Sequence, residues 1–196
     1  MTDLREQKAI LRGHMNEIRA EAAARDPDAA EKLAARFPIK LFRRYGPVVA
    51  AYSPIGEELD PHPLLQRLKG EGAEIVLPRV EPSGQLTFRR AEAARLEKGP
   101  FGLSQPSPAA PELRPNLVLA PLLAFDLRGR RLGYGKGYYD RAVAKLRGSG
   151  RVFYLGLAYA QQQADVVPHE SHDVLLDWVE TPLHSVPLFL GQALAR

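Results

Sequence analysis

The sequence contains no cysteine, and histidine occurs only five times among 196 residues. The absence of cysteine excludes disulfide bonds and every zinc site that needs a thiolate ligand. Any catalytic metal is therefore expected on carboxylate and phosphate oxygens, as Mg²⁺ prefers. No apolar run approaches the roughly 20 residues of a membrane span, and the polar start Met1-Thr-Asp-Leu-Arg-Glu does not resemble a secretory signal. We therefore expect a cytoplasmic protein that does not enter a membrane.

Acidic residues are fewer than basic ones, with 23 Asp and Glu against 27 Lys and Arg. The resulting net charge of +4 favours anionic ligands, but it does not choose among nucleotides, polyanionic metabolites and nucleic acid. A chain of 196 residues can bury one full hydrophobic core. We expect residues 1–196 to form a single domain.

Hydrophobic periodicity predicts two helices at the start of the chain. The apolar residues Leu4, Leu11, Met15, Ile18 and Ala22 recur at helical spacing and predict a helix of about six turns. Asp3 and Glu6 have the spacing of a capping box at its start. Asp26-Pro27 ends this helix, and a second one near 28–36 is expected to end at Phe37-Pro38, because a residue before proline avoids helical geometry.

Short apolar runs predict the strands of an α/β sheet. Residues 48–52 and 75–77, the latter closed by Pro78, are predicted strands joined by a helix at 62–69, which gives a βαβ unit. Residues 86–89 indicate an edge or hairpin strand, and the proline-rich stretch 99–115 is expected to be a lid or wrapping loop. Further strands are predicted at 117–120, 152–157 and 174–179, and a helix is predicted at 138–147. The apolar segment 186–190 is expected to pack on the sheet. The alternation predicts a three-layer α/β/α domain with a mainly parallel sheet, whose ligands bind at the carboxyl ends of its strands.

The most informative segment is the stretch 121–141, in which Gly133, Gly135 and Gly137 occupy every second position before Tyr138-Tyr139-Asp140. Backbone without Cβ atoms can approach a ligand closely, adopt positive φ and present N–H groups to phosphate oxygens. Gly137 follows Lys136 where a Walker A loop has Ser or Thr, and Tyr138 occupies the place of the third glycine of a dinucleotide fingerprint. The segment is therefore a candidate phosphate cradle of another kind.

Charged residues elsewhere allow two interpretations each. Arg5, Lys8, Arg12 and Arg19 form a basic stripe on the first helix, which suits an anionic partner and equally a solvated surface. Glu57-Glu58 follow the first strand, where they could accept hydrogen bonds from a substrate or favour the start of the helix after Asp60-Pro61.

Two aspartates are candidate ligands of Mg²⁺. Asp140 lies in the first turn of the helix after the glycines, where it could hold Mg²⁺ or simply favour the helix start. Asp173, in the polar segment His169-Glu-Ser-His-Asp173, is a possible second metal contact, and the histidines are expected to be peripheral. Asp126 could order the loop instead, and one of Tyr138 and Tyr139 is expected to enter the core.

Five segments together closely resemble the 5-formyltetrahydrofolate cyclo-ligases, also called methenyltetrahydrofolate synthetases. They are Lys8-Ala-Ile-Leu-Arg12, Glu58-Leu-Asp60, Leu77-Pro78, the block of Pro121–Asp126 with Arg131–Asp140, and His172-Asp173. Their order and spacing fit across nearly the whole chain, and the glycine block is the most specific part. The resemblance implies one cyclo-ligase domain over residues 1–196. It further implies an ATP- and Mg²⁺-dependent enzyme that converts 5-formyltetrahydrofolate to 5,10-methenyltetrahydrofolate and releases ADP and phosphate.

The resemblance also implies roles for individual residues. ATP would be bound by Lys8, Arg12, Arg131, Leu132, Gly133, Tyr134, Gly135, Lys136, Gly137, Tyr138 and Tyr139, among which Arg131, Lys136 and Tyr139 would assist the chemistry. Glu58 would bind the folate, with Tyr52, Phe125, Gly135 and Tyr138 as further candidates, and Asp140 with Asp173 would hold Mg²⁺. Family members often carry Thr two residues after the acid that matches Glu58, whereas this chain has Asp60.

The implied reaction has a clear chemical logic. A formamide is a poor electrophile because its nitrogen donates electrons into the carbonyl group. Our hypothesis is that the γ-phosphoryl group of ATP passes to the formyl oxygen, after which N10 attacks the carbon and phosphate leaves. The protein then mainly positions the reactants and screens their charge.

Two rival functions remain open from the residues alone. A phosphate-binding isomerase or transferase could use the same architecture, and it would act without ATP hydrolysis. An RNA-binding module is suggested by the basic balance and by Tyr138-Tyr139 among cations, and it would bind RNA in a salt-sensitive way. No recognised RNA-binding signature is present, so no nucleic-acid partner is expected.

Overall fold

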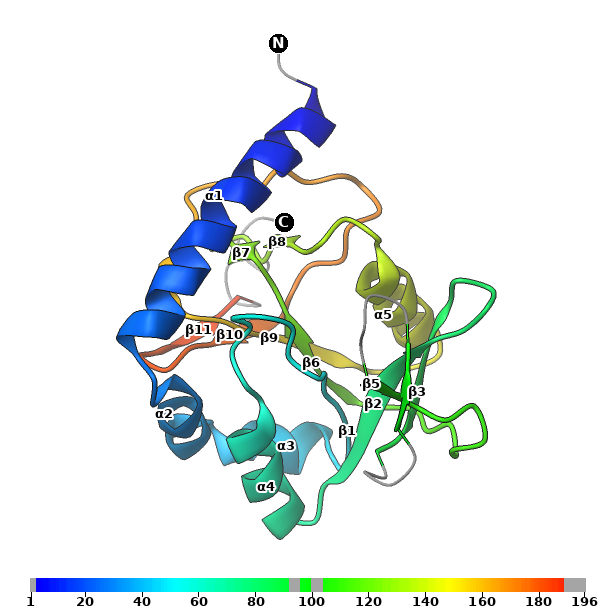
Figure 1. Ribbon diagram of the computed structural model, residues 1–196. Helices are drawn as coiled ribbons and strands as arrows, with labels where there is room; N and C mark the ends of the chain where they lie inside the picture. Colours follow the sequence, from blue (N-terminus) through cyan, green and yellow to red (C-terminus); the bar gives the residue numbers. More distant parts are fainter. Residues whose placement is uncertain (1–2, 92–95, 100–103, 189–196) are drawn as a thin grey trace.

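A computed structural model describes residues 3–91, 96–99 and 104–188, and its centre is a seven-stranded sheet (Figure 1). The strand order is β11-β10-β9-β6-β1-β2-β3. The strands are β1 (Val48–Ala50), β2 (Glu74–Val80), β3 (Leu86–Arg90), β6 (Leu117–Pro121), β9 (Phe153–Leu157), β10 (Trp178–Glu180) and β11 (Ser185–Pro187). Every pairing from β10 to β2 is parallel, whereas β11 and β3 run antiparallel at the two edges. The predicted mainly parallel sheet is confirmed.

Helices cover both faces of the sheet. They are α1 (Leu4–Arg25), α2 (Ala29–Arg36), α3 (Ile39–Tyr45), α4 (His62–Gly70) and α5 (Tyr138–Gly148). Leu33 of α2 and Leu64 of α4 share one buried cluster with the sheet residue Leu119. Val143 of α5 belongs to a second cluster with Val118, whose side chain points to the opposite face because strand side chains alternate. The predicted three-layer arrangement is therefore confirmed.

The long helix α1 is held across the ligand edge of the sheet by its apolar side. Met15 is buried with Leu132 and Val167, and Leu11 and Ile18 pack against the same cluster. Leu132 belongs to β8 (Arg131–Leu132), which pairs with β7 (Ala124–Phe125) in a small hairpin. The predicted capping box is wrong, because Asp3 makes no side-chain cap hydrogen bond. The exposed start of α1 leaves its first N–H groups to water.

Two elements differ from the sequence prediction because of proline. The helix α3 begins directly after Pro38, where the sequence predicts only the end of a helix. Proline lacks the N–H that a first helical turn leaves without a partner, so a helix can start there. Strand β2 likewise continues through Pro78, which lies opposite Phe88 of β3. On the β3 side, the Ala91 N–H donates to Ile75 and the Glu81 N–H donates to Gln85, so the even-numbered residues of β2 face β1, as the bond from the Ala51 N–H to Val76 shows. The Pro78 nitrogen therefore lies on the β1 side, beyond the end of β1 at Ala50, where no ladder N–H is needed.

The stretch 174–179 does not form one strand. Only Trp178–Glu180 joins the sheet, because the Leu176 N–H donates to the carbonyl of Gly129 in the turn between β7 and β8. After it, β11 confirms that the segment from Val186 packs on the sheet, whereas residues 189–190 lie outside the described part.

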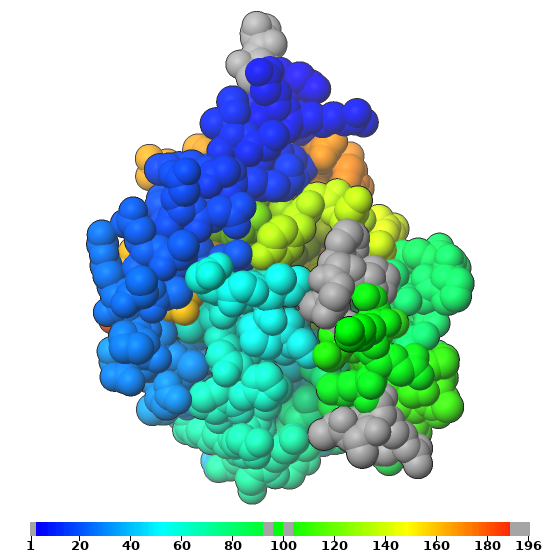
Figure 2. All heavy atoms as spheres, viewed as in Figure 1, coloured from blue at the N-terminus to red at the C-terminus, as the bar shows by residue number. Residues whose placement is uncertain are grey.

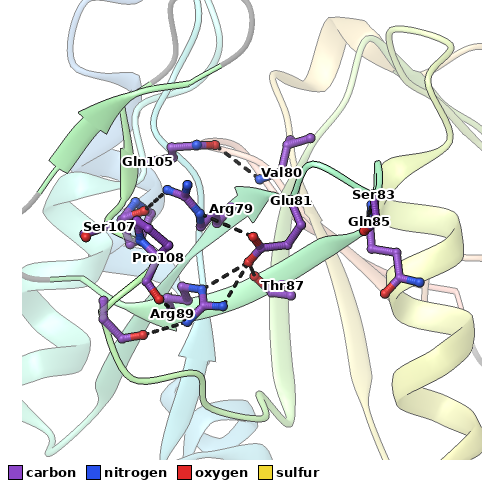
Figure 3. A network of polar contacts seen from close by, with 12 residues as sticks. Arg79, Val80, Glu81, Ser83, Gln85, Thr87, Arg89, Gln105, Ser107 and Pro108 are labelled. Atoms are coloured by element: carbon purple, nitrogen blue, oxygen red, sulfur yellow. Dashed lines mark hydrogen bonds and ion pairs between the residues drawn. The ribbon is translucent and has the colours of Figure 1, made fainter.

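A small hairpin that the sequence did not predict pairs β4 (Leu96–Lys98), just before the proline-rich stretch, with β5 (Ser104–Pro106) inside it. Figure 3 shows how side chains fasten it to β2 and β3. The Val80 N–H donates to Gln105 Oε1 at 3.2 Å, and Arg79 Nη1 donates to the Pro106 carbonyl at 2.6 Å. Arg89 donates to the carbonyls of Pro108 and Ala110. The described part of the stretch therefore wraps the β2–β3 edge, and residues 100–103 lie outside the described part.

No helix in the described part of the chain is both long and apolar enough to cross a membrane.

Candidate active site

The loops after β1 and β6 meet beneath α1 at the carboxyl edge of the parallel strands. Open α/β sheets bind ligands at this edge. In Figure 2 the blue atoms of α1 border both the yellow-green atoms of the segment after β6 and the cyan atoms of the segment after β1. The stretch from Gly133 to Gly137, here called the glycine loop, lies in the middle of this arrangement.

Two glycines of this loop are required by its geometry. Gly137 has a φ of 62° and forms the left-handed N-cap of α5, and Gly135 has a φ of 90°. A Cβ atom on Gly135 would lie 3.0 Å from Arg12 Nη2, so α1 approaches the bare backbone. Arg12 Nε also donates to the carbonyl of Gly133 at 2.9 Å. The helix α5 begins right after the loop, and its first N–H groups suit an anion.

A cleft of about 560 Å³ opens beside the loop. Its lining includes Gly135, Lys136, Gly137, Asp140, Arg141, His172 and Asp173. The cleft therefore combines backbone of the glycine loop with cations and with both aspartates that the sequence singled out.

Lys8 binds two carboxylates next to this cleft. Lys8 Nζ lies 2.7 Å from Glu170 Oε2 and 2.9 Å from Asp173 Oδ2. Burial works against the charge of Asp173, but hydrogen bonds from Lys8 and from the Glu170 N–H outweigh it and lower the pKa of that carboxyl. The hydrogen bond from Lys8 likewise lowers the pKa of Glu170. His172 lies at the exposed side of this pair, 3.6 Å from Asp173 Oδ1.

Asp140 is held by a buried guanidinium. Arg131 Nη2 donates to Asp140 Oδ2 at 2.9 Å, and the side chains are 7% and 13% exposed. The Val174 N–H donates to Asp140 Oδ1 at 3.2 Å. Because Val174 follows Asp173 in the chain, this bond brings the two candidate metal ligands to the same side of the cleft.

The donor chemistry of this corner fits Mg²⁺. Glu170, His172 and Asp173 each offer a ligand atom within 4.8 Å of the others, and Asp140 lines the same cleft. Carboxylate oxygens beside a phosphate cradle are the ligands that Mg²⁺ takes in proteins. Lys8 and Arg131 already neutralise part of the negative charge there.

Glu58 occupies a second position, on the other side of the glycine loop. It is 6% exposed, and its Oε2 accepts the Ile55 N–H at 2.9 Å. Arg19 Nη1 of α1 lies 4.0 Å from Glu58 Oε1, and Arg19 Nη2 donates to the Tyr134 hydroxyl at 2.9 Å. Burial raises the pKa of Glu58, and the Ile55 N–H, the charge of Arg19 and the Tyr134 hydroxyl oppose that rise.

Comparison with known proteins identifies the family. The model of the 5-formyltetrahydrofolate cyclo-ligase family matches residues 4–182. The chain belongs to this family. A 5-formyltetrahydrofolate cyclo-ligase of Haemophilus influenzae is 28% identical over 179 residues, which cover 87% of this chain and 95% of that protein. One of Mycolicibacterium smegmatis is 32% identical over 150 residues, which cover 72% and 76% respectively.

The fold agrees with this membership. The solved structure of Aquifex aeolicus 5,10-methenyltetrahydrofolate synthetase superposes with a TM-score of 0.75 at 29% identity and covers 92% of each chain. The resemblance drawn from the sequence is confirmed, and the cyclo-ligase family is a family of ligases.

The structure divides the residues that the cyclo-ligase resemblance assigned to ATP. Tyr134 turns toward Glu58 and Arg19, whereas Gly135, Lys136 and Gly137 line the cleft. Leu132 is buried under α1. Tyr139 packs against the core beneath the Arg131 guanidinium, which confirms that one tyrosine of the pair enters the core.

The residues predicted to contact the folate differ in how deeply they are buried. Tyr138 is half-buried, and the guanidinium carbon of Arg141 lies 5.4 Å from the centre of its ring. Tyr52 is buried and its hydroxyl donates to the Leu59 carbonyl at 2.5 Å, and Phe125 has no exposed surface. Their contacts with a substrate stay predictions.

Sequence reasoning assigned no role in the cyclo-ligase site to Arg19 and Glu170. Arg19 lies seven residues after Arg12, two turns along the same helical face, and this spacing is the signal that could have placed it over the site. Glu170 lies three residues before Asp173, but only the fold shows that Lys8 bridges the two. Asp126 orders the loop as expected, because its buried carboxylate accepts the N–H groups of Arg128, Arg130 and Val167.

The raised pKa of Glu58 predicts a pH-dependent cost in stability. An acid whose pKa rises on folding destabilises the fold as pH increases from its ordinary pKa, 4.5 for Glu, through its raised value. Glu58→Gln should therefore raise the free energy of unfolding at neutral pH, with a gain that shrinks as pH falls toward 4.5. Urea unfolding across this range measures the gain, and Glu57→Gln, at the exposed neighbour, is the control. A gain in the free energy of unfolding that does not change with pH, or a loss of it at neutral pH, would contradict the conclusion that burial of Glu58 destabilises the fold.

Proposed function

We propose that the protein is a 5-formyltetrahydrofolate cyclo-ligase that uses ATP and Mg²⁺ to form 5,10-methenyltetrahydrofolate, ADP and phosphate. Residues 1–196 act as one domain in this proposal, and the family match over residues 4–182 supports that extent. The reaction is supported by the names of the relatives. The positions proposed for ATP and the folate rest on one observation about the glycine loop. A cleft lined by cations and carboxylates lies on one side of the loop, and the buried acid Glu58 lies on the other.

In this proposal the cleft takes the triphosphate. The backbone of Gly133, Gly135 and Gly137 and the first turn of α5 offer N–H groups to phosphate oxygens. Lys8 and Arg12 reach the same place from α1, and Lys136 extends from the loop itself. Asp140 and Asp173 would hold Mg²⁺, which when bound supplies positive charge against the phosphate oxygens.

The folate lies on the other side of the loop. Glu58 accepts hydrogen bonds from N–H groups of the substrate, and Gly135 and Tyr138 border both sites. Tyr52 and Phe125, the other two candidate folate contacts, are buried in the substrate-free protein. In this proposal the formyl group of the folate meets the γ-phosphate of ATP at the glycine loop.

The proposed chemistry begins with transfer of the γ-phosphoryl group. The formyl oxygen forms a bond to phosphorus as the bond to the ADP oxygen breaks. The lone pair of N10 then attacks the activated carbon, N10 loses its proton, and the carbon–oxygen bond breaks to release phosphate. Arg131, Lys136 and the loop N–H groups stabilise charge on the transferring group, and Tyr139 positions Arg131 by packing under its guanidinium.

The direct test mixes the purified protein with ATP, Mg²⁺ and 5-formyltetrahydrofolate and follows the near-ultraviolet absorbance of the methenyl product. Product should form only when ATP is present and in equal amount to ADP. With heavy oxygen in the formyl group, the label should appear in the released phosphate. Product formation without ATP hydrolysis would support the rival isomerase or transferase function, and label left in water would exclude phosphorylation of the formyl oxygen.

Lys8 provides a test of the nucleotide side. Replacing it by Met removes a charge-assisted contact worth roughly 1.5–3 kcal/mol, so the KM for ATP should rise about ten-fold or more while the KM for the folate changes little. Lys40→Met, at an exposed lysine of α3, is the matched control. If Lys8→Met has the ATP dependence of the unaltered protein, the basic stripe of α1 is an ordinary solvated surface.

A further inference from the structure

The last cation of the basic stripe, Arg19, is buried with Glu58. Arg19 is 5% exposed and Glu58 is 6% exposed. Their nearest charged atoms, Arg19 Nη1 and Glu58 Oε1, are 4.0 Å apart, too far for a hydrogen bond. Arg19 is anchored instead through Nη2, which donates to the Tyr134 hydroxyl at 2.9 Å and to Asn16 Oδ1 at 3.4 Å.

This arrangement leaves two donors and one acceptor without partners. Arg19 Nε, Arg19 Nη1 and Glu58 Oε1 are buried and make no hydrogen bond of good geometry with the described protein. Buried polar groups in native proteins are nearly always hydrogen-bonded, and an unpaired one costs about 1–3 kcal/mol or more if it is charged. Three such atoms together at the ligand edge of the sheet indicate a place where the partner is a ligand.

The pattern of these atoms defines the chemistry of the ligand. The guanidinium requires a carbonyl or other acceptor, and the neighbouring carboxylate requires an N–H donor. A planar heterocycle with a carbonyl next to a ring N–H presents both groups along one edge. The pyrimidinone ring of a reduced folate has such an edge.

We propose that Arg19 is a substrate-recognition residue that binds the carbonyl of the folate pyrimidinone ring while Glu58 accepts the adjacent N–H. This inference rests on the proposed function and adds Arg19 to its folate side. Tyr134 links the two parts of the site, because its hydroxyl accepts from Arg19 while its backbone belongs to the glycine loop.

Arg19 has a second effect, on the charge of Glu58. The titratable groups that face Glu58 are Arg19 from α1, Tyr134 from the glycine loop, Tyr52 after β1 and Tyr139 from α5. Arg19 is the cation among these four. Its removal leaves burial unopposed by a nearby positive charge, so the pKa of Glu58 rises further and less of it is ionised at neutral pH. Folate binding should then require a higher pH.

The test compares Arg19→Met with Arg19→Lys and with Arg25→Met, a control at an exposed arginine of the same helix. In Arg19→Met the dissociation constant and KM for 5-formyltetrahydrofolate should rise about ten-fold or more, since a hydrogen bond to a charged group is lost. The KM for ATP should stay near that of the unaltered protein. Arg19→Lys keeps the charge but not the planar donors, so it should weaken folate binding while leaving the pH dependence of that binding closer to normal.

A second measurement does not depend on catalysis. Carbon-13 NMR of labelled glutamate, with the Glu58 signal assigned by its loss in Glu58→Gln, follows the titration of Glu58 in the substrate-free protein. Its midpoint should rise by about one pH unit in Arg19→Met and stay in place in Arg25→Met. An inactive unaltered protein would refute the proposed function and leave this readout intact. Unchanged titration, or unchanged folate affinity in both Arg19 variants, would overturn the role of Arg19.

Discussion

The arrangement of the site depends on how the apolar side of α1 packs. Leu11, Met15 and Ile18 bury against the β7–β8 hairpin and the segment around Val167, and this contact fixes the rotation of the helix about its axis. Because the basic residues occupy a neighbouring face, the same packing directs Lys8, Arg12 and Arg19 onto the loops at the carboxyl edge of the sheet. A single hydrophobic contact therefore sets the positions of three cations that lie far in sequence from the groups they bind.

The glycine loop separates two electrostatic environments. On one side, Lys8 pairs with Asp173 and Glu170 and lowers the pKa of both carboxyls, and Arg131 pairs with Asp140 at the same cleft. On the other side, burial dominates and raises the pKa of Glu58, and the charge of Arg19 opposes that rise. Phosphate and a divalent cation suit the first environment, and a neutral polar heterocycle suits the second. The proposed reaction needs both, one for each substrate.

The sequence predicted the layers of the fold and the loop because both follow from local patterns. Alternating apolar runs identify strands and helices, and glycine at every second position followed by Tyr138 identifies the loop. Prediction failed where tertiary context decides the outcome. Pro78 is tolerated in β2 because its nitrogen lies on the β1 side, beyond the last residue of β1. The pairing of Glu170 with Lys8 joins residues 162 positions apart. Arg19 had a visible periodicity, but its unpaired donors exist only in the folded protein.

The central claim is that the glycine loop lies between a nucleotide and a folate. Backbone amide NMR of the labelled protein tests this directly, with a non-hydrolysable ATP analogue and Mg²⁺ added first and 5-formyltetrahydrofolate added second. The nucleotide should shift the amide signals of Gly135 and Gly137 while Ile55 and Glu58 stay unchanged, and the folate should then shift Glu58 and Tyr134. Nucleotide-induced shifts on another surface, with Gly135 and Gly137 unaffected, would contradict the account.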